Sequence, residues 1–339
     1  MRKRLLNGWM LSVLAVCVAM LFASCNGNNA KRASVSDEVV IGIAWRADTT
    51  SEFYTNVRRA IEEAGATPVL LDMVMPEGYT HEDGKLADEY VDENGVLREE
   101  YASEVKGLAA ELSNVADVVS GVSAVVFTGG EDIAPTLLRC PEPWHGIEAE
   151  RDYNATRDVS DYLTMAYCLN HDMPVLGMCR GMQMLSVVSG ATIVQDIPAF
   201  YASRGIEYAF LHRNPCEAGQ YRDYSSHIVL ATRGTLLHKI AGTDSIVGAP
   251  SWHHQCVGSI EGTSLTVDGL TSTQGIDIIE AVERKDKTFC LGLQFHPEAA
   301  VVKHLDGAAN ESQFMTYDDA MRYFKELVQQ ARDYAKRQK

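Results

Sequence analysis

The sequence predicts an α/β protein with a doubly wound, mostly parallel sheet and helices on both faces of that sheet. Continuous apolar runs of strand length occupy residues 39–45, 123–127 and 173–178, and such runs are typical of strands buried on both faces. Segments with helical spacing separate the runs, and this alternation is the pattern of a doubly wound sheet. No repeat or low-complexity linker divides residues 39–339, which favours one domain.

The remaining elements follow from periodicity along the chain. Residues 52–64 carry apolar positions at helical spacing and stop at Gly65, a residue that commonly ends helices. The second half has more β character. The further predicted strands are residues 67–71, 228–231, 246–249, 265–267, 276–282 and 289–295, and the further predicted helices are residues 155–170, 181–189 and an amphipathic segment around 321–331.

One segment stands apart by its charge. Residues 82–104 hold nine acidic and two basic side chains with few large apolar positions. Runs of like charge are usually solvated, so we expect an acidic, partly helical insertion rather than a binding site.

The first residues have the pattern of an export signal. Arg2, Lys3 and Arg4 precede a 13-residue apolar stretch at residues 11–23, which is short for a membrane span and typical of a signal-peptide core. Small residues then lead to Cys25, as in a bacterial lipobox. A buried N-terminal helix with an incidental cysteine is the alternative.

We therefore expect residues 1–24 to be a lipoprotein signal peptide and residues 25–38 a tether with a lipid on Cys25. The protein would be exported and lipid-anchored in a bacterial cell envelope, on the periplasmic side or at the cell surface. Loss of the signal's three basic residues would leave 27 basic and 46 acidic residues, a net charge of −19. This charge argues against nucleic-acid binding and against electrostatic adhesion to an anionic membrane.

A candidate nucleophile lies where an apolar strand runs directly into a helix. Cys179 is flanked by Gly177 and Gly181, and Gly-x-Cys-x-Gly at such a junction is the cysteine version of a nucleophile elbow. The helix N-terminus favours thiolate, and the backbone N–H of Arg180 is free to bind an oxyanion. A buried structural cysteine is the alternative interpretation.

Two further motifs complete the candidate site. His296 and Glu298 follow an apolar strand at positions i and i+2, a spacing that puts two strand side chains on one face. A histidine oriented by a carboxylate is the proton carrier that a thiol nucleophile needs. Gly129 and Gly130 end another strand, where backbone N–H groups can approach a ligand and supply a second oxyanion donor.

Four phrases in this order resemble the class I glutamine amidotransferase-like family, and within it the γ-glutamyl-γ-aminobutyrate hydrolase type of cysteine peptidase. The phrases are Thr-Gly-Gly-Glu-Asp-Ile-x-Pro, Pro-Val-Leu-Gly-Met-Cys-Arg-Gly-Met-Gln, Ser-Trp-His-His-Gln and Leu-Gln-Phe-His-Pro-Glu. The resemblance covers roughly residues 39–332. The N-terminal signal and the acidic insertion depart from the family pattern.

The resemblance implies a role for each matching residue. Cys179, His296 and Glu298 would form the catalytic triad, and backbone N–H groups near Gly130 and at Arg180 would hold the oxyanion. The substrate-binding residues implied by the resemblance are Gln183, His254 and Gln255. The expected partner is a small γ-glutamyl compound whose amide carbonyl Cys179 attacks.

No metal and no cofactor are expected from the sequence. His253 and His254 are adjacent, but neighbours on a strand face opposite sides, and neither an i+4 partner nor an acidic ligand accompanies them. The other histidines, His212, His227 and His238, are isolated along the chain. We therefore interpret them as ordinary core or surface residues.

Three functions remain open on these residues. A hydrolase would use water to resolve a γ-glutamyl thioester on Cys179, a glutaminase would pass ammonia to a separate synthetase, and a binding lipoprotein would hold γ-glutamyl compounds without turnover. The chain has no Gly-Lys-Ser/Thr nucleotide loop, and an exported protein would lack cytosolic ATP-dependent partners. The Cys, His and Glu residues argue against an inert binder, so hydrolysis is the preferred prediction.

The lipid anchor is tested by replacing its attachment residue. We expect Cys25→Ala to release the protein from membranes, because the acidic chain has no other means of adhering to them. Fractionation of cells that express each form measures this, with Cys17→Ala as the matched control that stays membrane-bound. A Cys25→Ala protein that remains with the membranes would exclude lipid anchoring.

Overall fold

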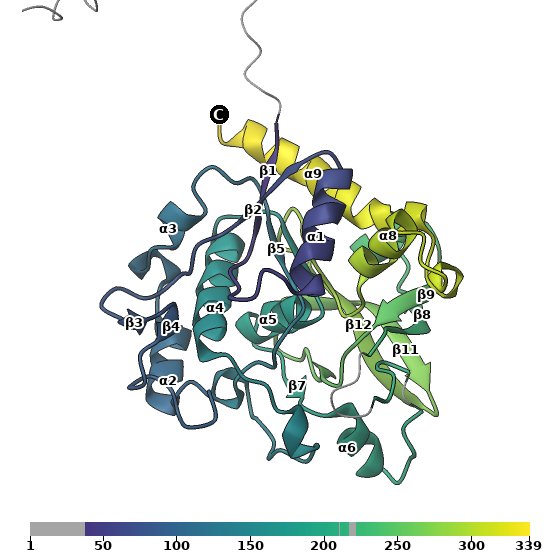
Figure 1. Ribbon diagram of the computed structural model, residues 1–339, viewed down its shortest axis with the longest axis horizontal. Coiled ribbons are helices and arrows are strands. Elements are labelled where there is room, and N and C mark those ends of the chain that lie inside the picture. The colour runs from purple at the N-terminus through teal and green to yellow at the C-terminus, as the bar shows by residue number, and fades with distance from the viewer. Residues whose placement is uncertain (1–37, 210, 217–221) are drawn as a thin grey trace, which may run out of the picture. The chain divides into compact units, whose positions relative to one another are not determined.

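The computed structural model describes residues 38–339 except residues 210 and 217–221 (Figure 1). The predicted signal peptide, Cys25 and almost all of the predicted tether lie outside the described residues. In the described part of the chain, no helix is both long and apolar enough to cross a membrane.

The described strands form a large mixed sheet of eleven strands and a separate short hairpin. Five neighbouring strands are parallel, in the order β2 (Thr67–Leu70), β1 (Val40–Ile43), β5 (Val125–Phe127), β6 (Val175–Met178) and β13 (Cys290–Leu293). The sheet continues through antiparallel strands β12 (Ile276–Arg284), β11 (Leu265–Thr273), β8 (Ser225–Ala231) and β9 (Ser245–Ser251). Two short strands, β7 (Ile193–Val194) and β10 (Cys256–Val257), join at β12, and the hairpin is β3 (His81–Glu82) with β4 (Lys85–Leu86).

The strand β6 shows why the sheet is covered on both faces. Val175 belongs to one buried apolar cluster, whereas Leu176 and Met178 belong to another, because successive strand side chains point to opposite faces. The first cluster is packed by α2 (Glu99–Gly107), α3 (Val115–Val118), α4 (Ala155–Asn170) and α5 (Arg180–Val188). The second is packed by α1 (Glu52–Glu63), α7 (Leu236–Ala241), α8 (Pro297–Leu305) and α9 (Tyr317–Arg337). The doubly wound prediction is confirmed.

The shorter helical segments lie in the connections. They are α6 (Ile197–Ala202), η1 (Ala110–Leu112), η2 (Pro135–Leu137), η3 (Glu148–Glu150) and η4 (Glu311–Gln313). The periodicity of the sequence did not indicate α6, α7 or α8, since helices of six to nine residues give too few turns for an apolar stripe to be recognised.

The acidic segment is only partly solvated. Most of its carboxylates are exposed, as expected, and its C-terminal part begins α2. Its apolar side chains are buried, however: Leu86, Tyr90 and Leu97 belong to the same core cluster as α4 and α5. The segment therefore covers one face of the sheet instead of standing away from it.

The packing of α5 against the sheet provides a stability test. A Cβ on Gly181 would lie 2.7 Å from Cβ of Phe127 and closer still to the Phe127 carbonyl oxygen, so Gly181→Ala must push α5 away from β5. We expect the free energy of unfolding to fall by about 1–3 kcal/mol in urea titration. Gly107→Ala, at the end of α2 with nothing within 4 Å of the added atom, is the matched control and should lose no stability. Equal stability of the two variants would contradict this packing.

Candidate active site

Cys179 is the single residue between β6 and α5. Its φ of 51° and ψ of −106° are strained for a residue with a side chain. The turn is possible because Gly177 packs directly on Gly181. A Cβ added to Gly177 would lie only 2.6 Å from the carbonyl carbon of Gly181. Cys179 is therefore held at the N-terminus of α5, as the Gly-x-Cys-x-Gly pattern predicts.

His296 and Glu298 lie beside each other, but not on a strand. Strand β13 ends at Leu293, two residues before the predicted end, His296 is the N-cap of α8, and Glu298 lies in the first turn of that helix. Pro297 explains the difference, because its fixed φ and missing N–H favour the first position of a helix. The expected i, i+2 strand geometry was wrong, although the contact forms: Nδ1 of His296 lies 2.7 Å from Oε1 of Glu298, and both side chains are fully buried.

The electrostatics of this pair favour a protonated imidazole. Burial alone would lower the pKa of His296, but the charges of Glu298 and Cys179 and their hydrogen bonds to the ring outweigh it and raise the pKa above the ordinary 6.5. Because Nδ1 contacts Glu298, Nε2 remains for proton exchange with Cys179. The rings of Phe53 and Tyr224 lie 5.5 and 5.2 Å from the imidazole and help to exclude water from the pair.

The Thr128–Gly129–Gly130 loop is fixed by two buried arginines. Arg157 donates to the carbonyl oxygens of Thr128 and Gly129 at 3.1 and 3.0 Å, and Arg46 donates to the Gly129 carbonyl at 3.3 Å. The arginines hold these two carbonyl groups in place. Gly130 follows them with a φ of 146°, and it lines the same cavity as Cys179.

Arg180 contributes to the site through both its backbone and its side chain. As the first residue of α5 it carries one of the N–H groups that have no acceptor within the helix. Its fully buried guanidinium pairs with Asp158 at 2.5 Å and with Asp161. Arg157 pairs with Glu131 and, at 3.4 Å, with Asp161.

This ion-pair network was not predicted from the sequence. Its acidic members Asp158 and Asp161 lie on the predicted helix 155–170, where charged residues ordinarily indicate a solvated face. Both carboxylates are fully buried. An Arg-Asp-x-x-Asp spacing in a helix that follows the Gly-Gly loop was the only signal in the sequence.

A cavity of about 350 Å³ opens beside Cys179. The predicted substrate-binding residues Gln183, His254 and Gln255 all line it. Nε2 of Gln183 donates to the carbonyl of Gln255 at 3.3 Å. Four further lining residues belong to the motifs that the sequence analysis identified, and they are Glu131, Asp132, Trp252 and His253. The lining residues that the sequence did not indicate are Arg46, Asp48, Ser51, Phe53, Glu150, Asp152 and Arg213.

His254 lies in the cavity wall between two carboxylates. Its Nε2 lies 3.1 Å from Oδ1 of Asp132 and its Nδ1 lies 3.4 Å from Oδ2 of Asp196. Burial lowers the pKa of His254, but the hydrogen bonds to these two carboxylates exceed that effect and raise it above the ordinary value. The two carboxylates therefore stabilise the protonated form of His254.

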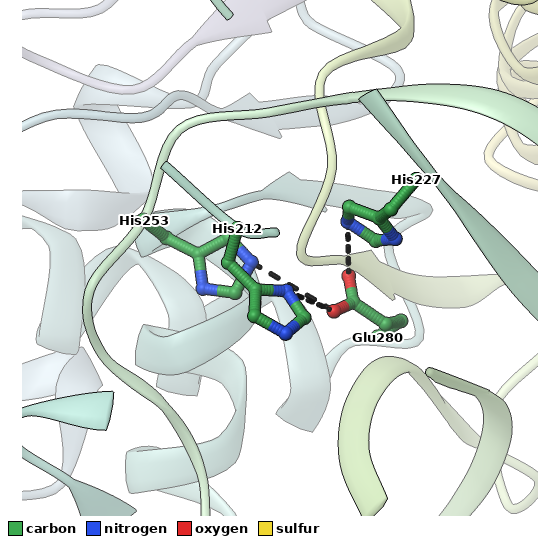
Figure 2. Close-up of side chains that lie close together, drawn as sticks. All are labelled: His212, His227, His253 and Glu280. Carbon is green, nitrogen blue, oxygen red and sulfur yellow. Dashed lines mark ion pairs between the residues drawn. The ribbon is translucent and has the colours of Figure 1, made fainter. Parts of the chain in front are cut away.

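His212 and His227 are buried core residues, as expected, but they are not isolated in space. His212 and His227 lie with His253 around the buried carboxylate of Glu280, which belongs to β12 (Figure 2). Only folding brings these four segments together, so their spacing in the sequence gave no signal. His238 is a partly exposed residue that contacts Asp244 at 3.0 Å, as expected for a surface histidine.

The effect of Glu298 can be measured directly as a change in the pKa of His296. We expect Glu298→Gln to lower the pKa of His296, because the substitution removes a charge that raises it and leaves burial, which lowers it. In the unaltered protein, the contact between His296 and Glu298 contributes its full stabilisation of the fold at pH values below 6.5, the ordinary pKa of histidine. This stabilisation is lost as the pH rises through the raised pKa of His296. Histidine NMR titration measures both proteins, with His254 as the internal control whose pKa stays raised by Asp132 and Asp196. An unchanged His296 titration would contradict the pairing.

Comparisons with known proteins identify the family of the chain. Residues 105–298 match the model of the Peptidase C26 family. The Mycobacterium tuberculosis protein Rv2859c, provisionally named a glutamine amidotransferase, is 31% identical over 225 residues, which are 66% of this chain and 61% of that protein. Protein NtpR of Enterococcus hirae is 29% identical over 185 residues, 53% of this chain and 68% of that protein.

Among solved structures, the glutaminase domain of the Trypanosoma brucei CTP synthase aligns with a TM-score of 0.46 and 13% identity, over 87% of this chain and 93% of that chain. The family match covers more than half of the chain and contains Gly130, Cys179 and His296. The chain belongs to the Peptidase C26 family of the class I glutamine amidotransferase-like proteins.

Proposed function

We propose that this protein is a cysteine-dependent hydrolase that cleaves γ-glutamyl amide bonds through a thioester on Cys179. The observation that carries the proposal is the strained Cys179 at the helix N-terminus, beside a buried His296–Glu298 pair. Membership of a peptidase family supports amide hydrolysis as the class of reaction.

The first half of the reaction transfers the acyl group to the enzyme. The thiolate of Cys179 attacks the amide carbonyl carbon, and the oxygen takes up the negative charge near the N–H groups of Gly130 and Arg180. His296, kept protonated by its partners, gives a proton to the amine nitrogen as the C–N bond breaks. The products are a free amine and a γ-glutamyl thioester.

Water completes the turnover. His296, now neutral, removes a proton from a water molecule while the oxygen attacks the thioester carbonyl. The C–S bond breaks, free glutamate leaves, and the imidazolium–thiolate pair is restored. Glu298 keeps the imidazole in one tautomer and stabilises its charged form during both halves.

The charges of the cavity support a γ-glutamyl substrate. A γ-linked glutamyl group carries a free α-ammonium and a free α-carboxylate, so its binding site needs both signs of charge. The cavity presents the carboxylates of Glu131, Asp132 and Asp152 and the cations Arg46 and His254. The names of several relatives refer to glutamine amidotransferases, and glutamine is itself a γ-glutamyl amide.

A glutaminase function is the second candidate, because a CTP synthase of Halobacterium salinarum is 32% identical to this chain over 137 residues. The two functions differ in the leaving group, which is ammonia for a glutaminase and a larger amine for a peptidase. We propose the peptidase, acting in the cell envelope where the predicted Cys25 lipid would hold it.

Removal of the nucleophile tests the mechanism. We expect Cys179→Ala to lower kcat for a γ-glutamyl amide by at least about 10³-fold, because the remaining groups only bind and polarise the carbonyl. Amine release measured by chromatography reports the rate. Cys140→Ala, at an exposed position, is the matched control and should retain the original rate. A Cys179→Ala protein with full activity would overturn the proposal.

A substrate panel tests the specificity. The unaltered protein should hydrolyse γ-glutamyl amino acids and γ-glutamyl amines with kcat/KM about 10²-fold or more above the α-glutamyl isomers, since the isomers place the ammonium and carboxylate wrongly. Glutamine in the same panel distinguishes a glutaminase from a peptidase. Hydrolysis of glutamine alone would favour the glutaminase, and equal rates on both isomers would exclude γ-glutamyl recognition.

A further inference from the structure

A cluster of four buried side chains lies directly behind the cavity wall formed by His253. His227 comes from β8, Glu280 from β12, His253 from the segment after β9, and His212 from the segment before β8. All four residues are more than nine-tenths buried. Figure 2 shows the three imidazoles directed at the Glu280 carboxylate, His227 at one oxygen and His212 and His253 at the other.

The facing atoms lack ordinary hydrogen bonds. Among the described residues, neither oxygen of Glu280 accepts a hydrogen bond of normal geometry. Nε2 of His227, Nε2 of His253 and both ring nitrogens of His212 also have no hydrogen-bond partner. Buried polar atoms in folded proteins are almost always paired. A cluster of several unpaired atoms that converge on one point therefore indicates a missing binding partner.

The hydrogen bonds on the outer side of two rings fix their protonation. Nδ1 of His253 lies 2.8 Å from the carbonyl oxygen of Gln255, so this nitrogen carries the proton. The hydroxyl of Thr271 donates to the carbonyl of Ile228 at 2.8 Å and lies 3.0 Å from Nδ1 of His227, so it accepts a hydrogen bond from that nitrogen. In both rings Nε2 is left with a lone pair that faces Glu280.

Lone pairs that face a carboxylate repel it unless a proton or a cation lies between them, and a single proton on Glu280 would serve only one of the three imidazoles. Neutral imidazole is the form that ligates a metal. Outer-side acceptors such as the Gln255 carbonyl are also typical of metal-bound histidines.

The distances fit a small tetrahedral ion. Ligands about 2.1 Å from such an ion lie about 3.4 Å from one another. Oε1 of Glu280 lies 3.0 Å from Nδ1 of His212 and 3.8 Å from Nε2 of His253. Oε2 of Glu280 lies 3.7 Å from Nε2 of His227. The candidate ligand atoms all lie within 4.8 Å of one another.

We propose that His212, His227, His253 and Glu280 form a binding site for one divalent transition-metal ion of the zinc class. Three imidazoles and one carboxylate suit Zn²⁺ in tetrahedral geometry. Four protein ligands complete the coordination shell, so the site is structural rather than catalytic.

The position of the site gives the ion a function in the fold. His253 lies next to Trp252, whose carbonyl oxygen is 3.8 Å from Sγ of Cys179. The Glu280 carbonyl accepts the N–H of Gln294 at 2.8 Å, two residues before His296. The ion would thus join β8 and β12 to the segment that forms one wall of the cavity.

Metal content of the purified full-length protein without a histidine tag tests the proposal. The protein carries Cys179→Ser, which removes the thiol that lies close to His296 and could itself bind Zn²⁺. After chelation and titration with ZnCl₂, elemental analysis should give about one equivalent per chain, and the unfolding temperature should rise. CoCl₂ should give the intense visible absorption of tetrahedral cobalt without a thiolate charge-transfer band.

Matched histidine variants locate the ion. His227→Gln and Glu280→Gln in the same background should lower zinc affinity at least 10-fold, whereas His238→Gln on the surface should not change it. Absence of zinc binding and of any rise in unfolding temperature in the Cys179→Ser protein would overturn the proposal even if the cluster variants fail to fold. Full zinc binding by His227→Gln, or a cobalt spectrum with thiolate or octahedral character, would also overturn it.

Discussion

The turn at Cys179 is the constraint on which the arrangement of the site depends. A single residue joins β6 to α5, and this is possible only because Gly177 and Gly181 pack without side chains between them. The turn places the thiol above the carboxyl end of the parallel strands, where neighbouring loops in doubly wound sheets meet. The Gly130 loop follows β5 and His296 follows β13, the strands on either side of β6, so each reaches Cys179 directly.

The buried charges behind this turn hold the same loops in position. Arg180 ties the start of α5 to Asp158 and Asp161 on α4, and Arg157 ties α4 to the loop after β5. Removing one member would leave a buried charge without a partner, which is strongly destabilising. The network therefore ties the position of the proposed oxyanion donors to the packing of α4 and α5, and accounts for charged residues in the interior of an otherwise apolar layer.

The sequence predicted the parallel half of the fold and the residues of the candidate site because both depend on local patterns. Apolar runs mark the buried strands, and Gly-x-Cys-x-Gly with His-Pro-Glu identifies the reactive side chains. Features that depend on long-range contacts were not predictable. Asp158 and Asp161 were indistinguishable from a solvated face, and Glu280 approaches His212, His227 and His253 only after the antiparallel strands have assembled. The helical start at Pro297 is different, because proline at a first helical position is a local signal that was interpreted as strand.

The central claim, a γ-glutamyl thioester on Cys179, is tested most directly by partitioning with hydroxylamine. If every substrate passes through the same acyl-enzyme, water and hydroxylamine compete for one species that no longer contains the leaving amine. The ratio of γ-glutamyl hydroxamate to glutamate should then be identical for γ-glutamyl substrates with different amines at a fixed hydroxylamine concentration. A ratio that changes with the leaving amine, or the absence of hydroxamate during turnover, would contradict the account.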